Sequence, residues 1–167
     1  MTVRGTVALL GLFAVLAAYL MLVAPPAARL PPLGDPLLAV PAARVTSLEI
    51  VWPDRRLRAT RESDGWRLDG GAAFPAGVVE DLLATLTTLR PMERLAGNEG
   101  TADYGLGSPG TSLVLLAGDT TVLQLEIGSR NPAWTGVYVR RTGAGEIELV
   151  GALLHWEVEK LRAIAPG

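Results

Sequence analysis

An uncharged apolar run near the N-terminus constrains this chain more than any other feature. Residues 5–24 read GTVALLGLFAVLAAYLMLVA and contain no charged side chain, and Arg4 stands just before them. A helix of this length spans about 30 Å, the thickness of the hydrocarbon core of a bilayer. Because a helix satisfies its own backbone hydrogen bonds, we predict that residues 5–24 contact the lipid bilayer and that residues 1–24 form an N-terminal transmembrane anchor.

A cleaved signal peptide is the competing interpretation, because it also combines a positive start with an apolar segment. The run here is longer than the usual apolar region of a signal peptide. Pro25 and Pro26 follow it directly, without a clean A-x-A cleavage site. Both observations favour a retained anchor. Arg4 and Arg29 flank the run almost evenly, so the short N-terminal tail is the feature that favours an extracytoplasmic domain.

Six prolines follow the apolar run within residues 25–43. Proline fixes φ and lacks a backbone N–H, so neither a helix nor a sheet can continue through this segment. The composition predicts a semi-rigid spacer, and the leucines within it are expected to lie against the membrane interface or the domain. A single domain over residues 44–167 remains.

The overall composition excludes several classes of site. The chain has no cysteine, which excludes disulfides, thiolate catalysis and cysteine-based metal sites. Its net charge is −2, so no broad basic surface is available and we expect no nucleic acid partner.

Alternating apolar and polar residues predict strands from residue 44 onward, and residues 111–117 are apolar on both faces, which predicts a central strand. The strands expected are residues 47–52, 56–60, 66–68, 92–95, 111–117, 123–127, 137–141 and 146–150. Apolar residues at helical spacing predict helices over residues 75–89 and 152–163. The fold class is therefore α+β, with a mostly antiparallel sheet or sheets and two helices, preceded by one N-terminal transmembrane helix.

Several segments of the domain occur in an order that is similar to a known family. They are VTSLEIVW, DGWRL, FPAGVVEDLLATLTTLR, DYGL, LEIGSR and GVYVRRTGAGEIELV. Over residues 44–163 this order resembles the DUF4340 family of bacterial domains of unknown function. The resemblance implies a protein behind one N-terminal membrane helix, often encoded near ABC-type exporter or gliding-associated membrane components. We accordingly expect the chain in the bacterial inner membrane. The resemblance supplies no catalytic residue.

Residues that could carry a reaction are few. His155 is the only histidine, which excludes multi-histidine metal sites, and we expect it to pack against a helix face or to cap one. Residues 105–110, GLGSPG, lack the lysine of a phosphate-binding loop and predict a turn. Two acidic pairs are expected on solvated surfaces: Glu80 with Asp81, and Glu146 with Glu148. We therefore expect no catalytic residue, no cofactor and no metal.

A candidate interface follows from the residue types that dominate protein interfaces. Trp134, Tyr138, Arg140 and Arg141 combine aromatic rings with guanidinium groups. The alternative is that Trp134 packs over the sheet while the arginines only solvate it. Tyr104 is expected to be structural, with its ring buried.

Three hypotheses about function follow. The first is a non-enzymatic accessory subunit that contacts partner proteins of a membrane complex in the cell envelope. The second is a binding module for an envelope lipid or glycan, which would need an apolar cavity between helix and sheet. The third is an enzyme that uses carboxylates alone, which would need two acidic side chains in one pocket.

Overall fold

The computed structural model describes residues 3–22, 34–96, 101–107 and 109–166, and the chain divides into two compact units, residues 1–31 and 32–167. In the first unit α1 (Val3–Leu22) is one continuous helix. Large apolar side chains along it are exposed, including Leu10, Phe13 and Leu16. Within the described residues, no helix was found to be long and apolar enough for a membrane crossing.

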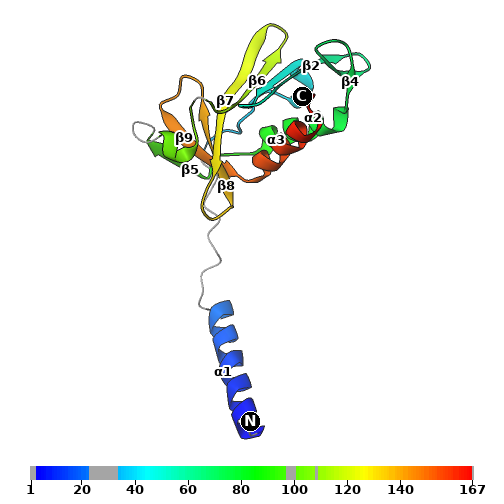
Figure 1. Cartoon of the computed structure of the whole chain (residues 1–167). Helices are drawn as coiled ribbons and strands as arrows, with labels where there is room; N and C mark the ends of the chain where they lie inside the picture. Colours follow the sequence, from blue (N-terminus) through cyan, green and yellow to red (C-terminus); the bar gives the residue numbers. More distant parts are fainter. Residues whose placement is uncertain (1–2, 23–33, 97–100, 108, 167) are drawn as a thin grey trace. The chain divides into compact units, whose positions relative to one another are not determined.

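The second unit is built on one antiparallel sheet (Figure 1). Its strands in chain order are β1 (Ser47–Val51), β2 (Arg56–Glu62), β3 (Gly65–Leu68), β4 (Ala73–Phe74), β5 (Glu93–Ala96), β6 (Thr111–Ala117), β7 (Thr120–Arg130), β8 (Gly136–Arg141) and β9 (Glu146–Gly151). In space their order is β4-β3-β2-β1-β6-β7-β8-β9-β5. Most neighbours in the sheet are neighbours in sequence, so short turns make most of the pairings.

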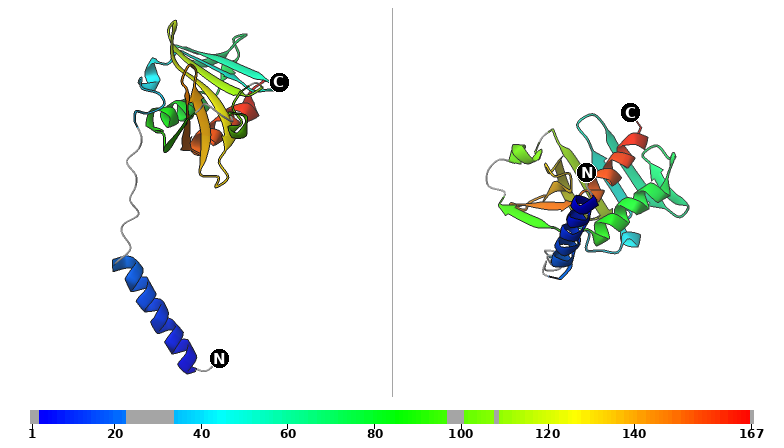
Figure 2. Two further views of the ribbon diagram at one scale, coloured as in Figure 1. Left: turned by 90° about the vertical axis from the view of Figure 1, so that its left-hand side faces the viewer. Right: turned by 90° about the horizontal axis from the view of Figure 1, so that it is seen from below.

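Two helices, α2 (Ala76–Thr88) and α3 (Leu153–Ile164), pack side by side on one face of the sheet (Figure 2). Each carries an apolar stripe at helical spacing, and that stripe is buried. α2 begins after Pro75 and ends at Thr88, and the next residue, Leu89, is extended. Pro91 follows two residues later and prevents the helix from continuing. We call the sheet face under these helices the inner face.

The inner face holds the main hydrophobic core. Side chains of β1, β6 and β7 alternate, so that Leu48, Ile50, Leu113, Leu115 and Leu125 point toward the helices and are fully buried. The helices complete the core with Val79, Leu82, Leu83, Leu86, Leu154, Val158 and Leu161. These apolar side chains pack together between the helices and the sheet.

The opposite, outer face is covered over only part of its width. The 3-10 helix η2 (Thr101–Tyr104) and Leu106 lie over β7. A Cβ on Gly128 would stand 2.2 Å from the Tyr104 carbonyl oxygen, so this close approach requires a glycine. Ile147 and Leu149 of β9 are buried even though they face away from the helices.

The described part of the predicted spacer, from Gly34 onward, packs with the domain. Leu37 and Leu38 are both almost fully buried. Their backbone N–H groups donate to the carbonyl oxygens of Leu89 (2.9 Å) and Leu86 (3.0 Å), at the carboxyl end of α2. The 3-10 helix η1 (Ala42–Arg44) then leads into β1. The expectation that spacer leucines lie against the domain is met at positions 37 and 38, while Leu30 and Leu33 lie outside the described residues.

The α+β class and the antiparallel pairing are confirmed. The described residues contain three α-helices. Two of them, α2 and α3, lie on the sheet, at the places where two helices were expected. The third is the N-terminal helix α1, which was expected to be transmembrane and which the structure does not show to be so. The short strand before residue 97 exists as β5, and it pairs with β9 at the far edge. β4 was not predicted.

Candidate functional site

The turn between β7 and β8 holds an exposed tryptophan in a fixed position. The Oδ1 atom of Asn131 accepts hydrogen bonds from the N–H groups of Thr135 (2.9 Å) and Gly136 (3.0 Å). The N–H of Trp134 donates to the Asn131 carbonyl oxygen (2.9 Å), which closes a β-turn that starts at Asn131. Pro132 occupies the second position of this turn, where proline is favoured. Trp134 is the last residue of the turn, and its φ of 61° lies in the left-handed region that favours glycine.

Two side chains of α3 and one arginine of β7 accompany this tryptophan. Trp134, Leu153 and Trp156 are 65%, 53% and 54% exposed. α3 starts beside the turn, where the Ala152 N–H donates to the Thr135 carbonyl oxygen (3.1 Å). The guanidinium carbon of Arg130 lies 3.7 Å from the ring centroid of Trp134 and 5.8 Å from that of Trp156. We call Arg130, Trp134, Leu153 and Trp156 the aromatic patch.

His155 packs beside this patch. Its ring meets the Trp156 ring edge-on, with 5.4 Å between centroids, as expected for a histidine that packs on a helix face. Partial burial, helped by the positive charge of Arg130, lowers the pKa of His155 below its ordinary value. The neutral imidazole is therefore favoured at neutral pH.

Tyr138 and Arg140, two of the expected interface residues, lie on the outer face. The ring of Tyr138 meets the ring of Tyr104 edge-on at 4.7 Å between centroids. Tyr104 is half-buried, so its ring is packed as expected but not enclosed. Arg140 Nη2 donates to Glu126 Oε2 at 2.6 Å, across the β7–β8 pair. Both contacts occupy these side chains within the domain.

Arg141 points to the inner face instead. Its Nη1 donates to the carbonyl oxygen of Leu37 (3.0 Å) and its Nη2 to that of Pro36 (3.5 Å). Its Nε lies 3.5 Å from Glu148 Oε2, and Arg94 Nε lies 3.4 Å from Glu148 Oε1. Arg141 thus holds the start of the domain.

The expectation that Glu148 is solvated is wrong, because this side chain is only 7% exposed. Glu148 of β9 stands opposite Val139 of β8, a residue of the inner face. Its carboxylate therefore lies on the inner face, between Arg94 and Arg141. The sequence contained a signal in the hydrophobic neighbours of Glu148, since Ile147 and Leu149 flank it. Its expected partner Glu146 is exposed.

The four predicted interface residues are thus divided among three places. Trp134 lies in the aromatic patch, Tyr138 and Arg140 lie on the outer face, and Arg141 lies beneath the sheet. Sequence reasoning missed Leu153 and Trp156. Their spacing of three residues, off the buried stripe of α3, is the signal that could have found them.

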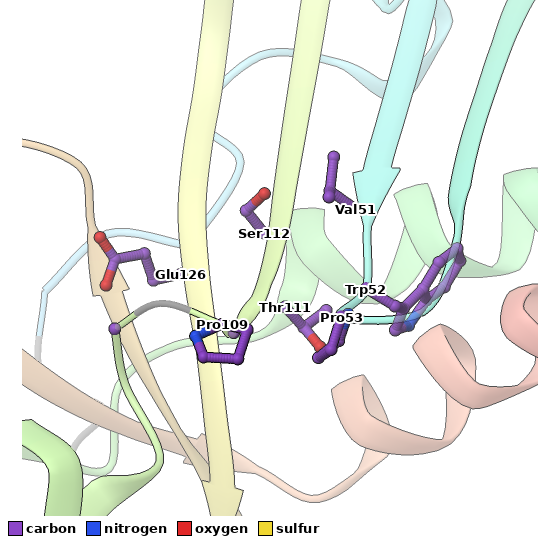
Figure 3. Close-up of a pocket in the computed structure, with 9 residues that line it drawn as sticks. Val51, Trp52, Pro53, Pro109, Thr111, Ser112 and Glu126 are labelled. Carbon is purple, nitrogen blue, oxygen red and sulfur yellow. The ribbon is translucent and has the colours of Figure 1, made fainter.

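A shallow depression of about 450 Å³ lies on the outer face, beside the covering loop (Figure 3). Val51, Ser112 and Glu126 line it from three neighbouring strands, and Pro53 and Pro109 close one end. Trp52 also lines it, and the indole Nε1 of Trp52 is buried without a hydrogen-bond partner among the described residues. Its one carboxylate, Glu126, is engaged by Arg140.

A second outer-face depression, of about 530 Å³, contains two carboxylates. Both are engaged by the same cation, because Arg58 contacts Glu49 at 2.6 Å and Asp69 at 3.9 Å. Among the described residues, no group of three or more His, Asp or Glu side chains could hold a metal ion. In both depressions the carboxylates are therefore held in ion pairs with arginines.

Together these features define a class of protein: a two-layer α+β domain that carries a helix pair on one face of a wide antiparallel sheet and an exposed aromatic patch at one end. A profile described as "Domain of unknown function (DUF4340)" matches residues 66–162, more than half of the chain. The chain belongs to the DUF4340 family. Searches among curated proteins and among solved structures found no match.

Proposed function

We propose that this chain is a non-enzymatic accessory subunit that α1 anchors in the bacterial inner membrane, with its DUF4340 domain on the extracytoplasmic side. The exposed apolar surface of α1 is the observation that carries the proposal. From position 9 to position 16 every side chain is exposed, so the apolar residues cover all sides of the helix. A helix that is hydrophobic all round needs a dry environment, which a bilayer provides.

The sequence supplies the length that this anchor needs. The uncharged run extends over residues 5–24, beyond the described end of α1 at Leu22. The proposal therefore rests on the run of residues and on their exposure.

The partner class follows from the family resemblance. We assign the domain to a membrane complex of the ABC-transport or gliding-related kind, in which it contacts other proteins. Ion pairs engage the carboxylates of the outer-face depressions, which supports a role without catalysis. The alternative of an envelope lipid- or glycan-binding module finds less support, because buried apolar side chains pack together between the helices and the sheet, where its ligand would bind.

Two arginines placed in the centre of α1 test the anchor. The double variant Leu12→Arg, Val15→Arg adds about 2.5–3.5 kcal/mol of insertion cost per residue. We expect the native chain to remain in membranes during alkaline carbonate extraction and the variant to be released. The matched control Thr120→Arg, Thr121→Arg adds the same charge at exposed positions of the domain and should stay bound.

Release of the native chain by carbonate would contradict the anchor. A reporter fused after Gly167 tests the orientation in the same cells. Activity of a reporter that works only in the cytoplasm would place the domain on the wrong side for this proposal.

A further inference from the structure

We propose that the aromatic patch docks the domain onto the lipid headgroup layer of the bilayer that holds α1. This inference rests on the proposed anchor and adds a second, reversible membrane contact made by the folded domain. The occupant is the lipid surface, and its chemistry is phosphate oxygens above the ends of acyl chains.

The patch concentrates the exposed apolar surface of the domain. In the described part of residues 34–166, five large apolar side chains are exposed: Met92, Trp134, Leu153, Trp156 and Ile164. Three of these five belong to the patch. Elsewhere on the domain large apolar side chains are largely buried. The exposed ones gather at the start of α3, which points to a surface that is buried against a partner when the protein functions.

The tryptophan is held outward by its backbone. Asn131 accepts two backbone hydrogen bonds across the turn and donates a third from Nδ2 to the Thr135 hydroxyl (3.0 Å). This network keeps Trp134 at its φ of 61°, a backbone conformation that is unfavourable for residues other than glycine. Because the turn is already fixed, it loses little conformational entropy when the Trp134 ring enters the lipid headgroup layer.

The arginine supplies a charge at the position where headgroup phosphates would lie. Arg130 stacks on the ring of Trp134 at 3.7 Å and lies 5.8 Å from the ring centroid of Trp156. The salt bridges of the described residues involve Arg140 and Arg141 but not Arg130. Tryptophan prefers the interface between hydrocarbon and water, and arginine there can reach phosphate with its guanidinium fork. The combination fits the headgroup layer of a membrane that contains anionic lipid.

The chain enters the domain at the same end as the patch. Leu37 is hydrogen-bonded to Leu89, and Leu89 Cδ1 lies 3.2 Å from the position of a Cβ on Gly151. The next residue, Ala152, is hydrogen-bonded to Thr135 of the turn. Ten peptide units separate residue 24 from residue 34, which allows at most about 35 Å between them. An inserted anchor therefore keeps the patch within reach of the bilayer surface.

The size of the patch favours lipid over a protein partner. A standard protein interface involves roughly 20–30 residues on each side. The patch offers three exposed apolar side chains and one cation. Such a small surface suits a contact that the anchor has already made local, since the tether raises the effective concentration of the bilayer.

Fluorescence quenching of the full chain in lipid nanodiscs tests the docking. Trp52 and Trp66 are buried, whereas Trp134 and Trp156 are exposed. We expect lipids brominated near the headgroup to quench part of the tryptophan emission of the native chain. The variant Trp134→Phe, Trp156→Phe should lose most of that quenching, and Arg130→Gln should reduce it in discs that contain anionic lipid.

A second measurement avoids substitution, in case the double variant folds poorly. The four indole N–H signals of the native chain are followed by NMR with a paramagnetic headgroup lipid. Broadening of the Trp134 and Trp156 signals, with Trp52 and Trp66 unaffected, supports the docking.

The outcomes separate this proposal from the anchor. A chain that stays with the nanodiscs but shows neither quenching nor broadening overturns the docking and leaves the anchor intact; such a patch would be free for a protein partner. A chain that does not stay with the nanodiscs overturns both proposals.

Discussion

Trp134 shows how much one residue can reveal about a surface. Its φ of 61° places Cβ close to the neighbouring carbonyl oxygen, which costs about 1–2 kcal/mol for a residue other than glycine. Three hydrogen bonds of the Asn131 side chain hold the turn in this form. Glycine would remove the strain, so the presence of a large exposed ring points to a use for that ring.

Two substitutions of Trp134 separate the strain from the ring. Trp134→Ala and Trp134→Gly both remove the indole and its stacking with Arg130. Only glycine relieves the backbone strain, and its greater freedom in the unfolded chain offsets part of the gain. We expect Trp134→Gly to exceed Trp134→Ala in free energy of unfolding by about 0.5–1 kcal/mol in urea titrations. Equal stabilities would show that the turn carries no strain.

His155 gives the domain a pH dependence of defined sign. Burial and the nearby Arg130 lower its pKa in the folded state, so the unfolded chain binds the proton more tightly. The stability that depends on neutral His155 is fully present above the unfolded pKa of about 6.5 and is lost as pH falls through the lower, folded pKa.

The variant His155→Gln isolates that contribution, because it keeps a polar side chain that does not titrate. We expect the native chain to lose more free energy of unfolding than the variant between about pH 7.5 and about pH 5. Parallel loss in both proteins would assign the pH dependence to carboxylates elsewhere.

At the scale of elements, periodicity predicted most of the fold. The alternation around Ile50 and the apolar stripe of α2 were clear, because a half-buried strand and a half-buried helix impose different repeats. β4 has only two residues, too few to show a repeat. The pairing of β5 with β9 joins segments about fifty residues apart, which local patterns do not encode.

Residues 34–38 belong to the folded core, although their proline content predicted a spacer. Leu37 is 1% exposed and packs in the core, and Arg141 binds its carbonyl oxygen. Leu37→Ala should therefore lower the free energy of unfolding by about 2–5 kcal/mol through loss of burial and a residual cavity. Chemical denaturation of the full chain measures this.

Leu153 is the matched control, since the same change is made at an exposed leucine. Leu153→Ala should alter the free energy of unfolding by less than about 0.5 kcal/mol. Similar losses for the two variants would show that residues 34–38 do not contribute to the folded core.

At the scale of the whole molecule, the sequence predicted the N-terminal helix, the sheet and the family more readily than the surface. The patch joins Trp134 to Trp156 through the contact between Ala152 and Thr135, and that contact exists only in the folded domain. Tyr138, Arg140 and Arg141 are close in sequence, yet strand alternation and ion pairing direct them to different surroundings. The residue types predicted an interface, but the topology of the sheet determines which of these residues share one surface.

The attachment of residues 34–38 also determines how the domain would bear mechanical load. Tension on the chain ahead of Gly34 would first reach the Gly34 carbonyl oxygen, which accepts a hydrogen bond from Arg90 (2.8 Å). It would then reach the carboxyl end of α2 through the N–H groups of Leu37 and Leu38. Arg141 would share it with β8, an interior strand of the sheet. Arg94 of the edge strand β5 also lies beside Gly34, where this path begins. A pull on the chain ahead of Gly34 would thus be shared among α2, β8 and the start of β5 instead of acting on one element alone.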